Sequence, residues 1–487
     1  MDKYWLDAEQ SIRYREEIEN TAVNAAQIKA YLGESDDFVA STLSFGAVHA
    51  YVFCIDGLVK DSVVDENILS AFHEMVVFQN CKSEAKAVKL LEQGYLQHAS
   101  VKKVGSLCAA IEAILSANFV IVFDACRCAF VFDIKGFSTR SIEQPESESV
   151  IKGSKDGFIE PIRMNTAIVR RHLRSHHLVI KQFELGSVSK TTVAVLYMKN
   201  IAAPALVQAV SQRLEQVDFS ALVSLGQVEK AISAKQFGML PTVMHTERAD
   251  KLCANILNGK VAVLADGYPV GFVVPANLAM FMQAPEDYAA APAYASFVRI
   301  IRYICLAVNV LLPALYIAVA NFSCEILPDK LAQSIMQAKF GMPFSTFTEV
   351  VLMLIAFEIL IESGLRLPNG VGQAVSIVSG LIVGDAAVSA KLASPAVVML
   401  TAIAGITSFV LPYQSLANAL RVMRFALVLA AAAGGLFALA IGVTVMIFYF
   451  NTIENFSLPF LTPFSTGGFS SWWKDTIVRR QRSGAKH

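Results

Sequence analysis

Charged residues are scarce in one long stretch of this 487-residue chain. Lys and Arg number 41, and Asp and Glu also number 41, yet only 12 of these 82 residues lie between Tyr303 and Phe450. With 54% hydrophobic and only 17% charged residues, the composition is too apolar for an ordinary soluble protein. The uneven charge predicts a soluble N-terminal region followed by a membrane region.

Several signals are missing, and each absence excludes a class of function. The N-terminus has no apolar core behind a basic start, so no secretory signal is expected and the soluble region belongs in the cytoplasm. The eight cysteines show no paired metal spacing, so we expect neither metal nor cofactor. Zero formal net charge argues against a nucleic-acid partner. The soluble half has no phosphate-binding loop, nucleophile elbow or His–carboxylate cluster, so we expect no enzyme.

Residues 1 to about 45 look helical and polar, and the elements that follow occur in the same order twice. Each copy reads as a strand, amphipathic helices and a hairpin of two apolar strands. In the first copy we expect the strand at 48–57 and the hairpin at 119–134. In the second copy we expect the strand at 191–202 and the hairpin at 261–275. The order predicts two related α/β subdomains, although a common order of elements can also recur by chance.

We assign the two subdomains to residues 1–137 and 161–290, with a polar linker at 138–160. The linker is rich in Ser, Glu, Pro and Gly, and an exposed connection is its simplest interpretation. The membrane domain is assigned to 291–452 and a basic tail to 453–487. The predicted fold is therefore an α/β soluble N-terminal region with two related subdomains plus an α-helical multi-pass membrane domain.

Arg299 and Arg302 precede an uncharged run of eighteen residues, 303–320. Such a run can cross the hydrocarbon core, and arginines at its start place the N-terminal region inside by the positive-inside rule. A later uncharged stretch, 425–450, is long enough to span with tilt.

The membrane domain contains four or five hydrophobic segments. The basic tail belongs in the cytoplasm by its charge, but five full spans would place it outside. We therefore expect one segment, 371–390, to be re-entrant or incomplete.

Four carboxylates fall within the apolar region, where each is costly. They are Glu349, Glu358, Glu362 and Asp385. Glu358 and Glu362 are four residues apart and share a helix face, while Glu349 lies about opposite. Glu349 and Glu362 can reach the two interfaces, whereas Glu358 needs a protein partner or water. A functional site is the working hypothesis for such residues.

One face of the segment after Pro368 is narrow and partly polar if the segment is helical. The face consists of Gln373, Ser376, Ile377, Gly380, Gly384 and Ala387. Small residues four apart commonly let helices pack closely in lipid. The same face, repeated around a symmetry axis, would line a tight water-accessible pore. The residues by themselves favour packing.

A series of motifs extends along most of the chain, from about Asp133 to Val478. The motifs are TRSIEQPESESVIKGSKDGFIEPIRMNTAIVRR (139–171), TERADKLCANILNGKVAVLADGYP (246–269), QAPEDY (283–288), LPALYIA (312–318), ESGLRLPNGVGQ (362–373), GLIVGDAAV (380–388), ASP (393–395), RVMRF (421–425) and FSLPFLTPF (456–464). In this order they resemble the A subunit of bacterial spore germinant receptors, the GerA family. The first 130 residues match only loosely.

The resemblance implies a receptor subunit in the spore inner membrane that helps convert a nutrient signal into ion release and exit from dormancy. It implies a transporter-like B subunit, thought to bind the germinant, and a C-type lipoprotein as partners. It also implies a homo-oligomeric ring whose membrane helices, surrounded by lipid, form a nutrient-gated cation channel. The narrow face then becomes the leading pore candidate. A non-conducting scaffold subunit and a secondary transporter stay open as alternatives.

Five arginines are candidates for gating or for contacts between subunits. They are Arg299, Arg302, Arg366, Arg421 and Arg424. We expect the nutrient-bound partner to shift the cytoplasmic ring, or the region of the first two arginines, and so to widen the constriction. Many family members carry an Arg and a further Glu at the positions of Ile361 and Leu354, so part of a possible ion-pair network is missing here.

Overall fold

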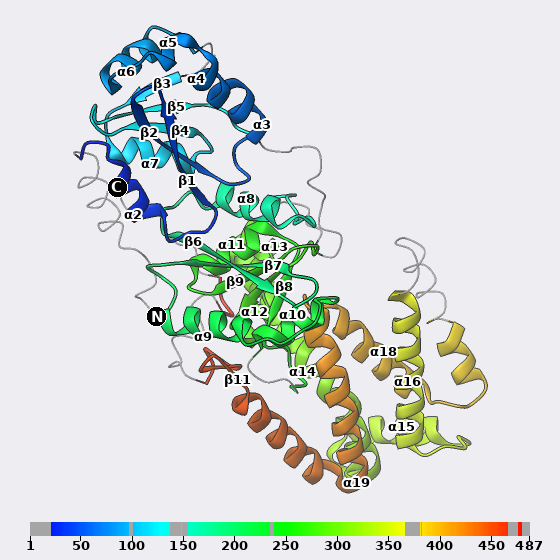
Figure 1. Cartoon of the computed structure of the whole chain (residues 1–487). Coiled ribbons are helices and arrows are strands. Elements are labelled where there is room, and N and C mark those ends of the chain that lie inside the picture. Colours follow the sequence, from blue (N-terminus) through cyan, green and yellow to red (C-terminus); the bar gives the residue numbers. More distant parts are fainter. Residues whose placement is uncertain are drawn as a thin grey trace. The chain divides into compact units, whose positions relative to one another are not determined.

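The computed structural model describes residues 21–96, 101–136, 148, 154–233, 238–365, 380, 382–465 and 476–479. These residues form two compact units (Figure 1). The α/β unit holds residues within 21–233 and 243–275, and the helical unit holds residues within 238–242 and 276–479.

The first part of the α/β unit is a five-stranded antiparallel sheet. Its strands are β1 (Phe38–Phe45), β2 (Val48–Ile55), β3 (Val101–Val104), β4 (Phe119–Phe123) and β5 (Cys128–Phe132), in the spatial order β1-β2-β4-β5-β3. Its helices are α2 (Ala25–Leu32), α3 (Asp61–Val63), the π-helical turn η1 (Val64–Leu69), α4 (Ser70–Glu74), α5 (Val76–Gln79), α6 (Glu84–Glu92) and α7 (Leu107–Leu115).

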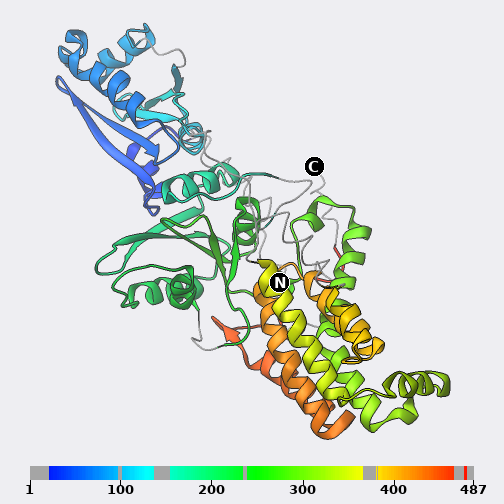
Figure 2. The ribbon, with the colours of Figure 1, turned by 90° about the vertical axis from the view of Figure 1, so that its right-hand side faces the viewer.

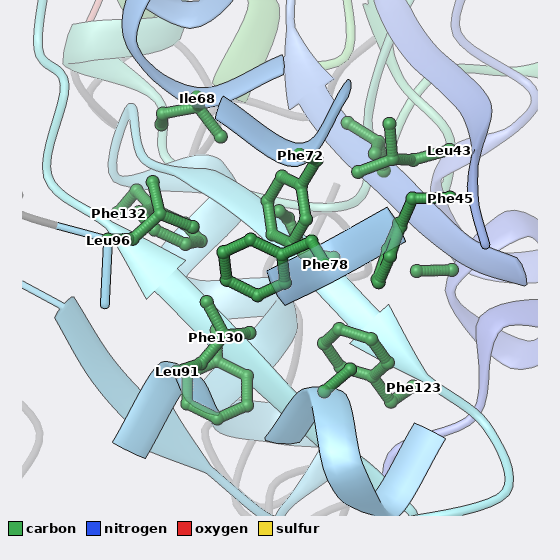
Figure 3. Packing of buried hydrophobic residues seen from close by; sticks show 14 of the residues in the cluster. Leu43, Phe45, Ile68, Phe72, Phe78, Leu91, Leu96, Phe123, Phe130 and Phe132 are labelled. Carbon is green, nitrogen blue, oxygen red and sulfur yellow. The ribbon is translucent and has the colours of Figure 1, made fainter. Parts of the chain in front are cut away.

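Both faces of this first sheet are covered, which explains the uninterrupted apolar sequence of β4 and β5. Ile121 of β4 belongs to a cluster with α4, α5 and α6, whereas its neighbour Val120 belongs to a cluster with α2 and α7. In the first cluster the ring of Phe72 lies 4.8 Å from those of Phe45 and Phe78 (Figure 3). The sheet is therefore the middle layer of a three-layer subdomain.

The second part of the α/β unit is another five-stranded antiparallel sheet. Its strands are β6 (Leu178–Leu185), β7 (Thr191–Met198), β8 (Met244–Thr246), β9 (Val261–Ala265) and β10 (Gly271–Val274), in the order β6-β7-β9-β10-β8. Its helices are α8 (Ile162–His172), α9 (Pro204–Glu215), α10 (Leu225–Ile232) and α11 (Ala249–Leu257).

The two sheets have the same topology. Each has two consecutive strands at one edge, then a hairpin, and at the other edge a short strand that precedes that hairpin in sequence. A helix stands immediately before the hairpin in both cases, α7 in the first sheet and α11 in the second. The predicted fold class, with two related α/β subdomains and a helical C-terminal region, is confirmed.

The expectation of helix over residues 1 to about 45 is correct for α2 and wrong for the strand that follows, while residues 1–20 lie outside the described residues. Residues 1 to about 45 were expected to be helical, but β1 occupies Phe38–Phe45 and pairs along its whole length with β2. The FVASTLSF sequence of β1 leaves most of its side chains exposed because it forms the sheet edge. The mixture of polar and apolar residues on this edge strand resembles the pattern of a surface helix. The pairing of β1 with β2, and not the local sequence, therefore determines the structure here.

The helical unit consists mainly of long apolar helices, which lie side by side in Figure 2. Its elements are α12 (Leu278–Phe281), α13 (Glu286–Ala289), α14 (Pro292–Phe322), the 3-10 turn η2 (Cys324–Ile326), α15 (Asp329–Lys339), α16 (Thr346–Leu365), α18 (Pro395–Phe409), α19 (Gln414–Thr452), β11 (Glu454–Asn455) and β12 (Leu458–Pro459). Residues 382–389 are also helical. In the described chain, α14 and α19 are long and apolar enough to cross a membrane, with mean hydropathy of 2.2 and 2.3.

The last of these helices, α19, is a hairpin of two arms. Gly434 and Gly435 have non-helical backbone angles, and Gly435, at φ +60° and ψ −144°, occupies a region essentially reserved for glycine. A Cβ on Gly442 would lie 2.8 Å from Leu427, although fifteen residues of straight helix would separate the two by about 22 Å. Figure 1 shows the two arms diverging from the bend. The single tilted span expected at 425–450 is therefore wrong, because two consecutive glycines reverse the chain within it.

Two ends of the helical unit can be defined, the proximal end where α14 begins and the distal end where it stops at Phe322. At the proximal end, the ring of Tyr413, just before α19, lies 5.2 Å from that of Phe281. At the distal end, a Cβ on Gly435 would lie 2.8 Å from Phe322 Cγ. The second arm returns to the proximal end, where Phe450 and Phe281 both contact the ring of Phe460. Both ends of α19 therefore lie at the end of the unit where α14 begins.

Candidate functional site

Glu358 of α16 is held by an arginine from α19. Arg424 Nη2 donates a hydrogen bond to Glu358 Oε1 at 2.7 Å, and Arg424 Nη1 donates to Asn309 Oδ1 of α14 at 3.0 Å. Arg421, one turn earlier on α19, places Nη1 3.7 Å from Glu358 Oε2. We call these four residues the charged clamp. It joins three helices through one carboxylate, one amide and two guanidinium groups.

Positive charge and hydrogen-bond donors are in excess in the charged clamp. Asn309 and Arg424 are almost completely buried, and Arg421 is only 8% exposed. Nε and Nη2 of Arg421, Nε of Arg424 and Nδ2 of Asn309 find no acceptor among the described residues. A buried donor without an acceptor costs about 1–3 kcal/mol. These unsatisfied donors reduce the net stability of the packed arrangement.

Asp287 lies between two arginines at the proximal end of α14. Arg299 Nε donates to Asp287 Oδ2 at 3.1 Å, and Arg302 Nη1 donates to the same oxygen at 2.7 Å. The two arginines are 0% and 6% exposed. On the other side, Arg299 and Arg479 both lie over the ring of Tyr288, at 5.4 and 5.7 Å. Arg299 and Arg302 thus fix the QAPEDY motif onto α14.

Glu349 lies in the first turn of α16 and caps α18. Its Oε2 accepts a hydrogen bond from the backbone N–H of Ser394 at 3.0 Å, immediately before α18 begins. Glu349 is 1% exposed, so its carboxylate faces the helix terminus and not water. The positive end of the helix dipole stabilises a carboxylate in this position. Glu362, further along α16, is exposed.

The narrow face predicted after Pro368 is only partly described. Gln373, Ser376, Ile377 and Arg366 lie outside the described residues. Gly384 lies against α18, because a Cβ there would be 3.5 Å from Val398, and Ala387 is buried. Gly380 has open space around its Cβ position. Asp385 is exposed. The pore-lining assignment of this face stays a prediction.

In the α/β unit, a buried ion pair connects the two subdomains. Arg170 of α8 donates from Nε and Nη2 to the two carboxylate oxygens of Asp37, both at 2.8 Å, and Nη2 also bonds to Ser35 Oγ at 2.7 Å. Arg170 and Asp37 are each 2% exposed. The sequence places these residues 133 positions apart, so nothing in it pointed to this pair.

The loop before β1 also covers the outer edge of β6. Asp36 N donates to Ile180 O at 2.8 Å, Ile180 N donates to Ser35 Oγ at 2.9 Å, and Gln182 N donates to Asp36 Oδ2 at 2.7 Å. The free backbone groups of an edge strand are thereby used within the chain. Backbone hydrogen bonds and a buried ion pair thus both connect the two subdomains.

The linker predicted to be an exposed connection is fixed at one described point. Glu148 Oε1 accepts from Lys251 Nζ of α11 at 2.6 Å, and the backbone oxygen of Glu148 accepts from Arg248 at 3.3 Å. Arg248 also donates to the backbone oxygen of Ser154 at 3.0 Å. Glu148 and Ser154 therefore contact the second subdomain.

Burial, more than charge, shifts the titration of several groups in the α/β unit. It raises the pKa of the Cys253 thiol to about 12 and lowers the pKa of Lys260 to about 8. A thiol with such a pKa is a poor nucleophile. Within the described parts of the chain, no group of three or more His, Cys, Asp and Glu residues is placed to hold a metal ion.

The order of the two units along the chain indicates the general class of protein. Two α/β subdomains precede a unit of long apolar helices that carry buried charges, which is the organisation of a membrane-associated protein with a large soluble part. The chain also matches the model of one family, described as Bacillus/Clostridium GerA spore germination protein, over residues 26–487. It belongs to the GerA family.

Individual relatives agree with this assignment. The chain is 32% identical over 466 residues to spore germination protein KA of Bacillus subtilis (strain 168), which covers 93% of this chain and 85% of the relative. It is 31% identical over 459 residues to spore germination protein B1 of the same organism, which covers 94% of each. Among solved structures, the N-terminal domain of the A subunit of the Bacillus megaterium spore germinant receptor GerK3 matches with a TM-score of 0.42 and 22% identity, over 53% of this chain and 98% of that one. Membership of this family supports a role in spore germination.

Proposed function

We propose that this chain is the A subunit of a spore germinant receptor and that it forms, as a homo-oligomer, a nutrient-gated cation channel. The observation that supports the channel is the charged clamp. Three membrane helices meet at Glu358, Arg424 and Asn309, and four donors in the clamp have no acceptor among the described residues. Buried ionic groups at membrane depth are expensive and usually serve ion pathways or switches.

The location proposed is the spore inner membrane, with several spans and a cytoplasmic N-terminal region. The hairpin form of α19 supports this arrangement, because both of its ends lie at the proximal end, where α14 begins. The basic tail and Arg299/Arg302 then belong to the same side, as the positive-inside rule requires. No re-entrant segment is needed to account for the charge of the tail.

In the proposed mechanism the charged clamp keeps the pathway closed. Nutrient bound to a B-type subunit, with a C-type lipoprotein in the same receptor, shifts the equilibrium toward a state in which α16 and α19 separate. Such a shift requires that the bound state favour the open arrangement by its own contacts. Water that enters on opening supplies acceptors to the clamp donors, which lowers the cost of the open state.

A scaffold subunit that carries no ions is the second candidate. It is favoured by the packing of Gly384 against Val398, since small residues that serve only helix packing need no lumen. A secondary transporter would also use broken helices and buried carboxylates.

Gly380 offers a test of the channel because no described atom lies within 4 Å of its Cβ position. We expect Gly380→Leu, in spores of the natural host, to change K⁺ release after addition of yeast extract, or to cause release without it, at normal abundance by immunoblot. Gly105→Leu is the matched control, since Gly105 of the α/β unit is equally open. Unchanged release from Gly380→Leu spores would favour the scaffold.

A further inference from the structure

The helix at 382–389 has two different faces in the chain. Gly384 lies against α18, with Val398 3.5 Å from its Cβ position, and Ala387, three residues later on the same side, is buried. The opposite face is exposed and consists of Ile382, Asp385, Ala386 and Ser389. These positions recur at three- and four-residue intervals, which places them in one stripe along the helix. The stripe carries a carboxylate, a hydroxyl group and a small side chain next to one large apolar residue.

Asp385 is an exposed carboxylate within an apolar segment, more than one helical turn before the distal end of its helix. Lys391, at the turn between this helix and α18, has a positive φ and marks the distal end of the helix. Six residues separate Asp385 from Lys391, which corresponds to about 9 Å along a helix. Unlike Lys or Arg, an aspartate side chain is too short to extend its charge along the helix over that distance. A carboxylate at this position is stable only against water, a cation or a polar partner.

We infer that the exposed stripe of Ile382, Asp385, Ala386 and Ser389 faces the lumen of the ring, where Asp385 of each copy attracts cations. The inference rests on the proposed channel and identifies the face that lines it. Along residues 382–389, α18 lies against Gly384, so we place the lumen on the opposite side, and this assignment replaces the pore-lining role predicted for Gly384 and Ala387. Gly380, one turn earlier, has nothing within 4 Å of its Cβ position and stays a candidate for the same pathway. A ring of carboxylates from several copies repels anions and concentrates cations at that point. Ser389, one turn nearer the distal end, offers a hydroxyl oxygen to a partly hydrated ion.

Accessibility to water distinguishes a lumen from lipid contact. The full chain carrying Ser389→Cys is treated in native membrane vesicles, together with its natural partners, with a charged methanethiosulfonate reagent. We expect labelling above that of the parent chain, whose eight cysteines provide the background. Ala387→Cys is the matched control on the covered face and should stay at background. Equal labelling of the two variants, or no labelling of Ser389→Cys, would overturn the inference.

Ion selectivity tests the carboxylate itself. In the Glu358→Gln background, which the proposed mechanism expects to leak without nutrient, vesicles are assayed for Rb⁺ and Cl⁻ flux. We expect Asp385→Asn to lower the ratio of Rb⁺ to Cl⁻ permeability by roughly tenfold, the lower end of the effect of a charged site on local ion concentration, and Asp385→Glu to restore it. Glu325→Gln, which removes an exposed carboxylate of the distal connection, should leave the ratio as it is.

The outcomes separate the two proposals. If the Glu358→Gln vesicles conduct no more than vesicles without the chain, the proposed channel fails, and the lumen with it. If they conduct and Asp385→Asn leaves the ratio unchanged, the channel stands and the role of Asp385 is wrong.

Discussion

Glu358 and Arg424 face each other from two helices that are 66 residues apart in sequence, with Oε1 and Nη2 at 2.7 Å. The protein partner that the sequence predicted for Glu358 is therefore Arg424 of the RVMRF motif. An ion pair of this kind is not itself strongly stabilising, but removing one member leaves a charge buried without a partner. The charged clamp therefore makes α16 and α19 depend on each other.

Neutralising Glu358 should weaken the helical unit and open the pathway. Glu358→Gln leaves two buried guanidinium groups without a carboxylate, and because the Glu358 side chain is itself 28% exposed, we expect the cost to fall below the value of about 3–5 kcal/mol for a fully buried pair. We expect spontaneous K⁺ release from spores and a lower melting temperature of the detergent-solubilised chain. Glu358→Gln combined with Arg424→Gln removes charge of both signs and should recover part of the stability. A double variant no better than the single one would mean that the pair is not the source of the effect.

The Arg170–Asp37 pair should hold the two subdomains of the α/β unit together. Asp37→Asn removes the charge that two guanidinium nitrogens contact, so we expect a loss of about 3–5 kcal/mol in the free energy of unfolding. A control is Asp133→Asn, because Asp133 pairs with Lys135 at the surface and such pairs contribute about 0–1 kcal/mol. Hydrogen exchange should locate the loss at β1 and β6. Uniform exchange across the chain would argue against a local joint.

A side chain at Gly435 should disturb the α19 hairpin for two separate reasons. The backbone angles there cost a non-glycine residue about 1–3 kcal/mol. A Cβ would also approach Phe322 Cγ to 2.8 Å. We expect Gly435→Ala to lower the abundance and the melting temperature of the chain more than Gly267→Ala does. Gly267 has φ +82° with nothing within 4 Å of its Cβ position, so it measures backbone strain alone.

Gly435→Ala with Phe322→Ala should recover the part of the loss that comes from the clash. If both glycine variants behave alike, Phe322 does not limit the bend.

The charge on Lys260 should reduce the stability of the α/β unit at neutral pH. Burial lowers the pKa of this amine from 10.5 to about 8. Between these values the unfolded chain binds more protons than the folded one, so the contribution of Lys260 to stability rises with pH. We expect Lys260→Met to raise the melting temperature at pH 7 and to have less effect near pH 10.5. Lys230→Met, at an exposed position of α10, is the control. An equal effect of Lys260→Met at both pH values would contradict the shift.

Local patterns were enough to predict the repeated α/β arrangement, because β4, β5 and β9 are continuous apolar strands next to clear turns. They failed for β1, whose exposed edge carries polar residues, and for α19, where length and hydropathy gave no sign of a bend. The pair Gly434–Gly435 was the available signal, since two adjacent glycines permit angles that end a helix.

The site shows the same division. The energetic cost of a carboxylate at membrane depth was enough to single out Glu358, but the partners of Glu358 depend on how helices distant in sequence pack together. Asn309 was missed because a lone asparagine in an apolar helix has no distinctive spacing. Asp287 was missed as a functional residue because it sits in the one-turn helix α13, and only the fold brings Arg299 and Arg302 to it.

The cover that Ser35 and Asp36 provide for β6 limits how copies of this chain can associate. An uncovered edge invites a strand from another molecule, and pairing of that kind continues without limit into filaments. Here the hydrogen bonds of Ile180 and Gln182 are already made within the chain. In the proposed homo-oligomer, contacts at Ile180 and Gln182 would therefore be made by side chains, and contacts of that kind can set an angle between neighbours that closes a finite assembly.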